Sequence, residues 1–229
     1  MQNDNNKEKK TERISWKYLI HEITHLFHFE SGYFFTVKEL FIRPGIVMNE
    51  FLFYDRNKYV KPIVYLIFNS VIFSLVLSFC KFNYDFFTLN ASKSKFGRYL
   101  EVNKLNDWLN SHIGYNAIII GLVMSLWLLI FFRKRKLNYF ENVVLLCYSF
   151  AQALIILSVF IVIAKLTSLQ IIINIGYIFS LLYLIWSLAN FYDSKKVLNY
   201  VKILVCCYIT LLTYQYILYL FAYIAYLVK

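Results

Sequence analysis

Five apolar runs dominate the larger, C-terminal part of the chain, and each is long enough to cross a bilayer as a helix. A spanning helix needs about 20 mostly apolar residues, and the central parts of these runs contain no Asp, Glu, Lys or Arg. The runs cover residues 63–80, 113–132, 143–164, 171–189 and 203–225. This pattern predicts an all-α, polytopic membrane protein with about five transmembrane helices, in which residues 63–229 form one transmembrane domain.

The first 62 residues have a different pattern. Residues 1–12 are polar, which predicts a disordered tail. Between residues 14 and 29, apolar side chains share one arc of a helical projection and polar ones, including the histidines, occupy the opposite side. This predicts an amphipathic helix that lies in the membrane interface and ends at Ser31-Gly32. We therefore expect residues 13–62 to form a cytoplasmic or interfacial amphipathic region.

Local signals divide the last part of this region into two short helices. Thr36 and Glu39 have the spacing of a capping box, which predicts a helix that begins at Thr36. Arg43-Pro44-Gly45 should interrupt this helix, because the residue before a proline disfavours the α region. Pro44 can then open a second short helix, and Pro62 is well placed to open the first spanning helix.

Composition agrees with a membrane protein, but the high positive charge needs an explanation. Hydrophobic residues make up 60% of the chain and charged residues 16%, against about 45–50% and 25% in soluble domains. The net charge is +11, but Lys and Arg lie between the apolar runs and before the first one, as in membrane-protein loops. We expect membrane phospholipids as partners and no nucleic acid. A protein partner or a homo-oligomer stays open.

The basic residues also predict an orientation. Of the 24 Lys and Arg residues, 17 lie on one side of the predicted spans and seven on the other. The positive-inside rule then places the N-terminus in the cytoplasm, together with loops 133–142 and 190–202. With five spans the C-terminus is extracytoplasmic, and the protein is expected to be a multi-pass protein of the inner membrane.

The string His21-Glu22-Ile23-Thr24-His25 matches the H-E-x-x-H pattern of zinc proteases. On a helix its two imidazoles share one face, where they could hold zinc while Glu22 activates a water molecule. His28 extends the same face. These side chains lie opposite the apolar arc, however, so an interfacial helix would show them to the cytosol. We therefore expect no catalytic residues, metal or cofactor, with zinc at His21, His25 and His28 as the weaker alternative.

Four basic residues accompany the short apolar segments before the first span: Arg43, Arg56, Lys58 and Lys61. Basic residues beside interfacial helices are typical of binding to anionic headgroups, at about 1 kcal/mol per charge near the surface. The same residues could equally serve only to orient the protein in the membrane, or they could contact a protein partner. All three interpretations stay open.

Uncharged polar side chains occur within the predicted spans, among them Asn69, Ser74, Gln152, Asn174, Thr210 and Gln215. Ion-coupled pumps usually need an ionisable group inside the membrane, so this class is disfavoured. Uncharged polar groups more often bond between helices, but these six are also the candidates for a small-molecule cavity. A transporter or channel would need a cavity that joins Asn69, Gln152 and Gln215.

The block GYFFTVKELFIRPG, followed by FLFYDRNKYVKP and the apolar runs, resembles an uncharacterised bacterial membrane-protein family, domain of unknown function 3667. The shared pattern consists of Gly32, Thr36, Lys38-Glu39-Leu40, Arg43-Pro44-Gly45, Arg56, Tyr59 and Pro62. Many members carry a Cys-pair zinc ribbon before this block, but this chain has no cysteine before Cys80, so no zinc is carried over. The activity of the family is unknown, so the resemblance implies an architecture and no chemistry.

Together these features favour a non-enzymatic integral membrane protein: a scaffold, a lipid-associated factor or a partner subunit. A small-molecule transporter or channel, and a zinc hydrolase built on His21 and His25, are the alternatives.

Overall fold

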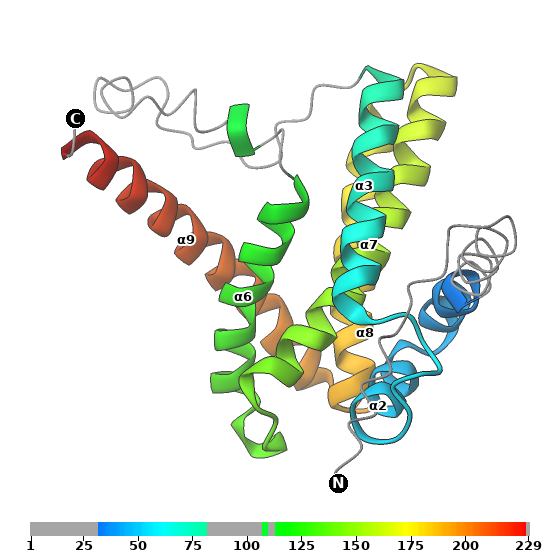
Figure 1. Ribbon diagram of the computed structural model, residues 1–229, viewed down its shortest axis with the longest axis vertical. Coiled ribbons are helices and arrows are strands. Elements are labelled where there is room, and N and C mark those ends of the chain that lie inside the picture. The colour runs from blue at the N-terminus through cyan, green and yellow to red at the C-terminus, as the bar shows by residue number, and fades with distance from the viewer. Residues whose placement is uncertain (1–31, 82–106, 110–112, 228–229) are drawn as a thin grey trace, which may run out of the picture.

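The computed structural model describes residues 32–81, 107–109 and 113–227, and within these ranges the chain forms helices and turns but no strand. The all-α class is therefore confirmed. A helix covers residues 32–42. The helices that follow are α2 (Pro44–Phe53), α3 (Pro62–Cys80), α6 (Ile113–Phe131), the short η2 (Arg133–Arg135), α7 (Tyr139–Thr167), α8 (Ile171–Tyr192) and α9 (Val197–Leu227) (Figure 1).

The five long helices alternate in direction (Figure 1). Helices α3, α7 and α9 begin at the end of the molecule that holds α2, and α6 and α8 end there. Four of the five, all except α6, are long and apolar enough to cross a membrane. The described apolar part of α6, Asn116–Phe131, is shorter. These four helices make the protein a multi-pass membrane protein, and a fifth span stays a prediction.

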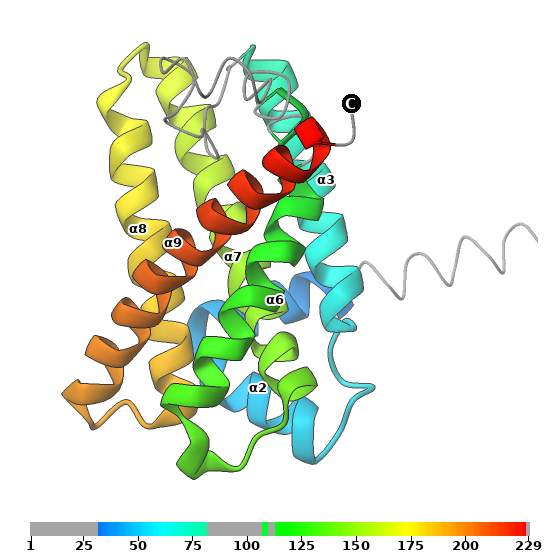
Figure 2. The ribbon, with the colours of Figure 1, turned by 90° about the vertical axis from the view of Figure 1, so that its left-hand side faces the viewer.

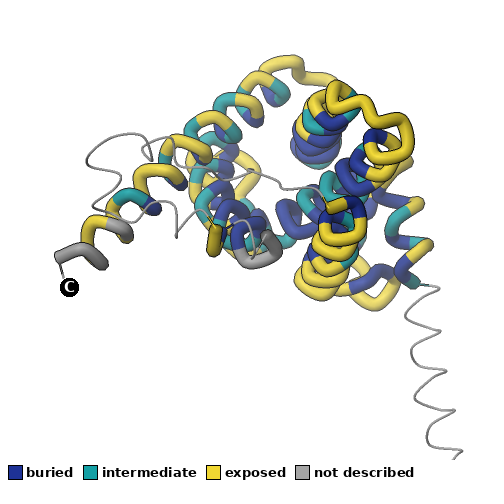
Figure 3. Tube along the Cα trace, turned by 90° about the horizontal axis from the view of Figure 1, so that it is seen from above, coloured by how far each residue is buried: buried dark blue, intermediate teal, exposed yellow. Residues whose placement is uncertain are grey.

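The bundle is built around α7, which packs between α3 and α8, while α9 crosses the bundle obliquely (Figure 2). Buried residues face the inside of the bundle and exposed ones face outward when the molecule is seen from above (Figure 3). Many of the exposed side chains are large and apolar, including Leu75, Phe79 and Leu166. A water-soluble protein rarely shows such an apolar surface. This surface therefore suits contact with lipid.

Helices α7 and α9 extend beyond the predicted apolar runs. The Asn138 side chain accepts a hydrogen bond from the Glu141 amide at 2.8 Å, and the Glu141 carboxylate accepts one from the Asn138 amide at 2.7 Å. This capping box starts α7 at Tyr139. The length of an apolar run thus indicates a span, but polar capping residues outside the run decide where α7 begins.

The predicted capping box at Thr36 and Glu39 is wrong. Residues 32–42 are helical, so Thr36 lies inside a helix and Gly32 does not end one. The Thr36 hydroxyl donates to the Gly32 carbonyl at 2.7 Å and accepts from the Val60 amide at 3.1 Å. A threonine inside a helix commonly bonds back to the carbonyl four residues earlier, and here a distant amide gives its oxygen a second role.

The predicted tail over residues 1–12 and the predicted amphipathic helix over residues 14–29 lie outside the described residues. The same holds for His21, Glu22, His25 and His28. The two proline predictions can be compared with the structure: α2 begins at Pro44 and α3 at Pro62, and each proline stands at the first helical position, where its fixed backbone angle suits a helix start.

Candidate functional site

The helix over residues 32–42, α2 and the following turn form one unit, residues 32–61, which we call the N-terminal block. Its inner face is part of the protein core, since Thr36, Leu40 and Met48 have no exposed surface. Its outer face carries large apolar side chains that are more than half exposed: Phe34, Ile42, Phe53 and Tyr54. The block therefore packs on the bundle with one face and leaves these four large apolar side chains mostly exposed.

The break between the two short helices brings the backbone of α2 against the end of α8. A Cβ atom added at Gly45 would lie 2.6 Å from the carbonyl carbon and oxygen of Asn190 and 2.8 Å from the nitrogen of Phe191. All three are backbone atoms, so no side chain can turn away to make room. Only glycine fits this contact. The close packing of α2 against α8, rather than the geometry of a turn, therefore explains why position 45 is a glycine.

Pro44 leaves one carbonyl group without its usual helical partner. In a continuous helix the Leu40 carbonyl would accept a hydrogen bond from the amide at position 44, which proline lacks. The Tyr183 hydroxyl of α8 donates to this carbonyl at 2.9 Å. Because buried backbone groups are almost always paired, Tyr183 both satisfies the break and joins the block to α8.

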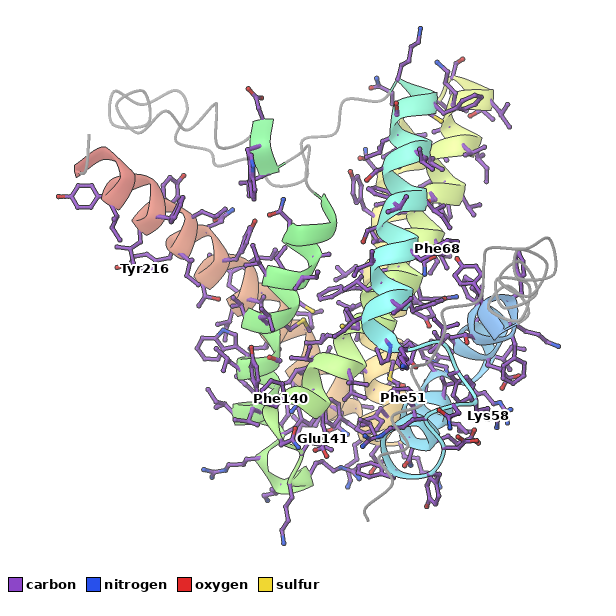
Figure 4. The ribbon with its side chains drawn as sticks, in the orientation of Figure 1. Phe51, Lys58, Phe68, Phe140, Glu141 and Tyr216 are labelled. Atoms are coloured by element: carbon purple, nitrogen blue, oxygen red, sulfur yellow. The ribbon has the colours of Figure 1, made fainter. Side chains whose placement is uncertain are left out.

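Replacing Tyr183 with phenylalanine should leave the Leu40 carbonyl buried and unpaired, which costs about 1–3 kcal/mol. We expect the purified protein to unfold at a lower denaturant concentration in a mild detergent. Tyr216→Phe is the matched control, because Tyr216 is 71% exposed on α9 and points away from the bundle in Figure 4. Equal stability of the two variants would show that Tyr183 does not hold the block.

A second group of buried hydrogen bonds joins the block to α3 and α7. Gln152 of α7 accepts a hydrogen bond from the Tyr65 hydroxyl of α3 and donates one to the Val37 carbonyl at 3.2 Å. Asn69 of α3 accepts from the Tyr33 hydroxyl at 2.6 Å and donates to the Tyr65 carbonyl at 2.8 Å. Side chains of two spanning helices thus hold the first turns of the block.

These bonds decide the roles of the three amide residues that a transport path would need. Asn69 and Gln152 are buried and bonded within the network, whereas Gln215 is exposed on α9. The structure does not bring the three together. Among the described residues, the polar cavity that a transporter or channel would need is therefore not formed by these three, because Asn69 and Gln152 bond between helices instead.

The segment that leads from α2 to α3 is fastened by three side chains. The Val60 amide donates to Thr36, and its carbonyl accepts from the Tyr148 hydroxyl of α7 at 2.7 Å. Nearer α2, the Glu50 carboxylate accepts two hydrogen bonds, one from the Tyr59 hydroxyl at 2.7 Å and one from the Lys58 ammonium at 2.6 Å. Each connection returns the chain to the block or the bundle, so the start of α3 is fixed.

The four candidate headgroup residues have two different environments. Arg43 forms an ion pair with Glu39, whose hydrogen bond raises the pKa of the arginine. Lys58 pairs with Glu50 beside α2 (Figure 4), and the hydrogen bonds from Lys58 and Tyr59 lower the pKa of the Glu50 carboxyl. All four side chains are exposed, but within the described part of the chain Arg56 and Lys61 form no ion pair. Arg56 and Lys61 are therefore better placed than Arg43 and Lys58 to meet a phosphate group.

The described residues contain no group of three or more His, Cys, Asp or Glu side chains that could hold a metal ion. The candidate ligands His21, His25 and His28 are outside these ranges, so the zinc alternative remains untested.

Sequence reasoning missed Tyr148 and Tyr183, which donate to Val60 and Leu40. Pro44 could have indicated that the Leu40 carbonyl needs a hydrogen-bond donor from elsewhere, because proline has no amide to supply one. The position of a proline does not show which distant residue is that donor.

The comparisons with known proteins concern the same part of the chain. Residues 30–74 match the model of a family described as "Protein of unknown function (DUF3667)". The match covers the whole N-terminal block and α3 as far as residue 74, and it confirms the resemblance. No curated protein and no solved structure matches the chain.

Proposed function

We propose that the protein is a non-enzymatic, lipid-associated factor of the inner membrane, with its N-terminal block in the cytoplasmic headgroup layer. One observation carries this proposal: the basic residues gather at the end of the bundle that holds the block. Arg43, Arg56, Lys58, Lys61, Arg133–Lys136, Lys195 and Lys196 lie in the block or in the turns at this end. At the opposite end the described basic residues are Lys81 and Lys165. This asymmetry supports a cytoplasmic position for the basic end.

The outer face of the block supports the same proposal. Exposed Ile42, Phe53 and Tyr54 lie in the same block as exposed Arg56 and Lys61. An apolar face beside basic residues suits the boundary between acyl chains and anionic headgroups. The block would then contact lipid with its outer face while its inner face remains in the protein core.

The orientation can be tested with reporters fused to the full chain. A reporter after Lys136 should read cytoplasmic, because η2 lies at the basic end, and one near Asn90 should read external. An external reading at Lys136 would contradict the proposed orientation.

Lipid binding can be tested by native mass spectrometry of the protein in a mild detergent with added phosphatidylglycerol. Replacing both Arg56 and Lys61 with glutamine should weaken binding about tenfold or more, at about 1 kcal/mol per charge. The matched control replaces Lys81 and Lys165, at the opposite end of the bundle, and should change little. If both double variants bind phosphatidylglycerol like the native chain, the block has no role in lipid binding.

The other classes have less support. A scaffold or partner subunit, including a homo-oligomer, would use the same exposed outer face and remains the alternative if lipid binding fails. The transporter would need a polar path that Asn69 and Gln152 do not provide. The zinc hydrolase would need metal bound at His21 and His25, and metal analysis of the protein with and without His25→Ala tests it.

A further inference from the structure

A pocket of about 300 Å³ lies within the bundle, between α3, α6, α7, α8 and α9. This volume is at the lower end of the range for small-molecule sites. Its lining side chains are mostly large and apolar, among them Phe73, Met124, Phe150, Leu154 and Leu184. The lining includes no charged side chain. The pocket is therefore suited to an uncharged, apolar molecule.

One polar group in the lining lacks a partner. Thr210 of α9 is 1% exposed, and its hydroxyl makes no hydrogen bond within the described part of the chain. The hydroxyl groups of two other nearby residues are paired: Ser180 donates to the Ala153 carbonyl at 3.1 Å, and Thr213 donates to the Ile209 carbonyl at 2.9 Å. A buried unpaired hydroxyl is costly, so a ligand that accepts its hydrogen bond would gain affinity at this position.

The pocket opens sideways rather than toward water. Leu181 of α8 and Leu211 of α9 both line it, and they are 47% and 50% exposed on the outer, apolar surface. Thr210 is the fourteenth residue of the 25-residue apolar span of α9, Val197–Phe221, and so lies close to the middle of the hydrocarbon layer. The ligand would enter from the acyl chains, with its polar atom deep in the membrane.

We propose that this pocket binds a neutral, membrane-soluble carbonyl compound, such as the ring of an isoprenoid quinone, whose oxygen accepts a hydrogen bond from Thr210. A phospholipid acyl chain would fill the apolar space but leave the hydroxyl unpaired, because its ester oxygens lie at the membrane surface. A charged solute would find no side chain of opposite charge in the lining. This site is separate from the N-terminal block and does not depend on headgroup binding.

The test uses the full chain in lipid nanodiscs and a benzoquinone with a decyl tail as the probe. Quinones quench nearby tryptophan, and Trp127 of α6 donates to Thr213, three residues from Thr210. We expect saturable quenching by the probe, with affinity about fivefold lower in Thr210→Val, which keeps the side-chain volume and removes the hydroxyl. Decylbenzene, which lacks a carbonyl, should displace the probe only with a dissociation constant at least fivefold higher than that of the probe itself.

Two further variants complete the test. Ala153→Phe fills the pocket and should abolish saturable quenching, provided that its circular dichroism is native. Thr167→Val removes a hydroxyl that bonds to the Ile163 carbonyl near the end of α7 and should leave binding unchanged. Quenching that is non-saturable, or equal in native and Thr210→Val proteins, would overturn the proposal. The Thr210 variant decides the question even if Ala153→Phe does not fold.

Discussion

Replacing Gly45 with alanine should separate α2 from α8 and destabilise the folded protein by about 3 kcal/mol, at the upper end of the usual range for overpacking. The added Cβ would lie 2.6 Å from the Asn190 carbonyl atoms, and a helical backbone cannot yield locally. Relief requires that the whole of α2 move away. The change should appear as a lower midpoint of chemical unfolding in a mild detergent.

Two other glycines provide matched controls for this substitution. A Cβ added at Gly121 of α6 would meet the Phe150 ring at 3.5 Å, an ordinary contact, and one at Gly32 would meet nothing within 4 Å. Alanine at either position should be neutral or stabilising by up to about 1 kcal/mol, because glycine is the weaker helix former. If Gly45→Ala is as stable as Gly121→Ala, the close approach of α2 and α8 does not occur.

Replacing Gln152 with leucine should cost about 2 kcal/mol, because two buried hydrogen bonds are lost and the Tyr65 hydroxyl stays buried without its acceptor. The effect should be measured by chemical unfolding of the purified protein. Adding Tyr65→Phe to Gln152→Leu should cost little more, since the partner is already gone, and the two single costs should not add.

Gln215→Leu is the control for this pair, because Gln215 is exposed on α9 and an apolar side chain suits a surface that faces lipid. It should leave stability unchanged. A Gln152→Leu variant as stable as Gln215→Leu would mean that the network around Gln152 does not hold the block.

The features that sequence predicts well in this chain are local ones. The apolar runs predict the spanning helices because length and composition alone decide whether a segment suits a bilayer. Pro44 and Pro62 predict the starts of α2 and α3 because a proline fixes its own backbone angle and removes its own amide. The capping box of Asn138 and Glu141 was equally readable, since both residues stand next to the helix start.

The features that sequence does not predict depend on distant partners. Thr36 has the spacing of an N-cap, but the structure makes it an acceptor for Val60, 24 residues away. The donors for Leu40 and Val60 are 143 and 88 residues away in sequence. Thr210 was readable as a polar residue within a span. Only the packed bundle shows that its hydroxyl lacks a partner while those of Ser180 and Thr213 have one.

The central claim is that the N-terminal block is part of the folded core and does not merely rest on the membrane. Hydrogen exchange of the full chain in lipid nanodiscs tests it most directly, by comparing the amides of residues 33–53 with those of α7. We predict that the block exchanges as slowly as α7 and that Gln152→Leu accelerates exchange in the block alone. Exchange over residues 33–53 as fast as in the exposed turn at residues 54–58, with α7 still protected, would contradict the claim.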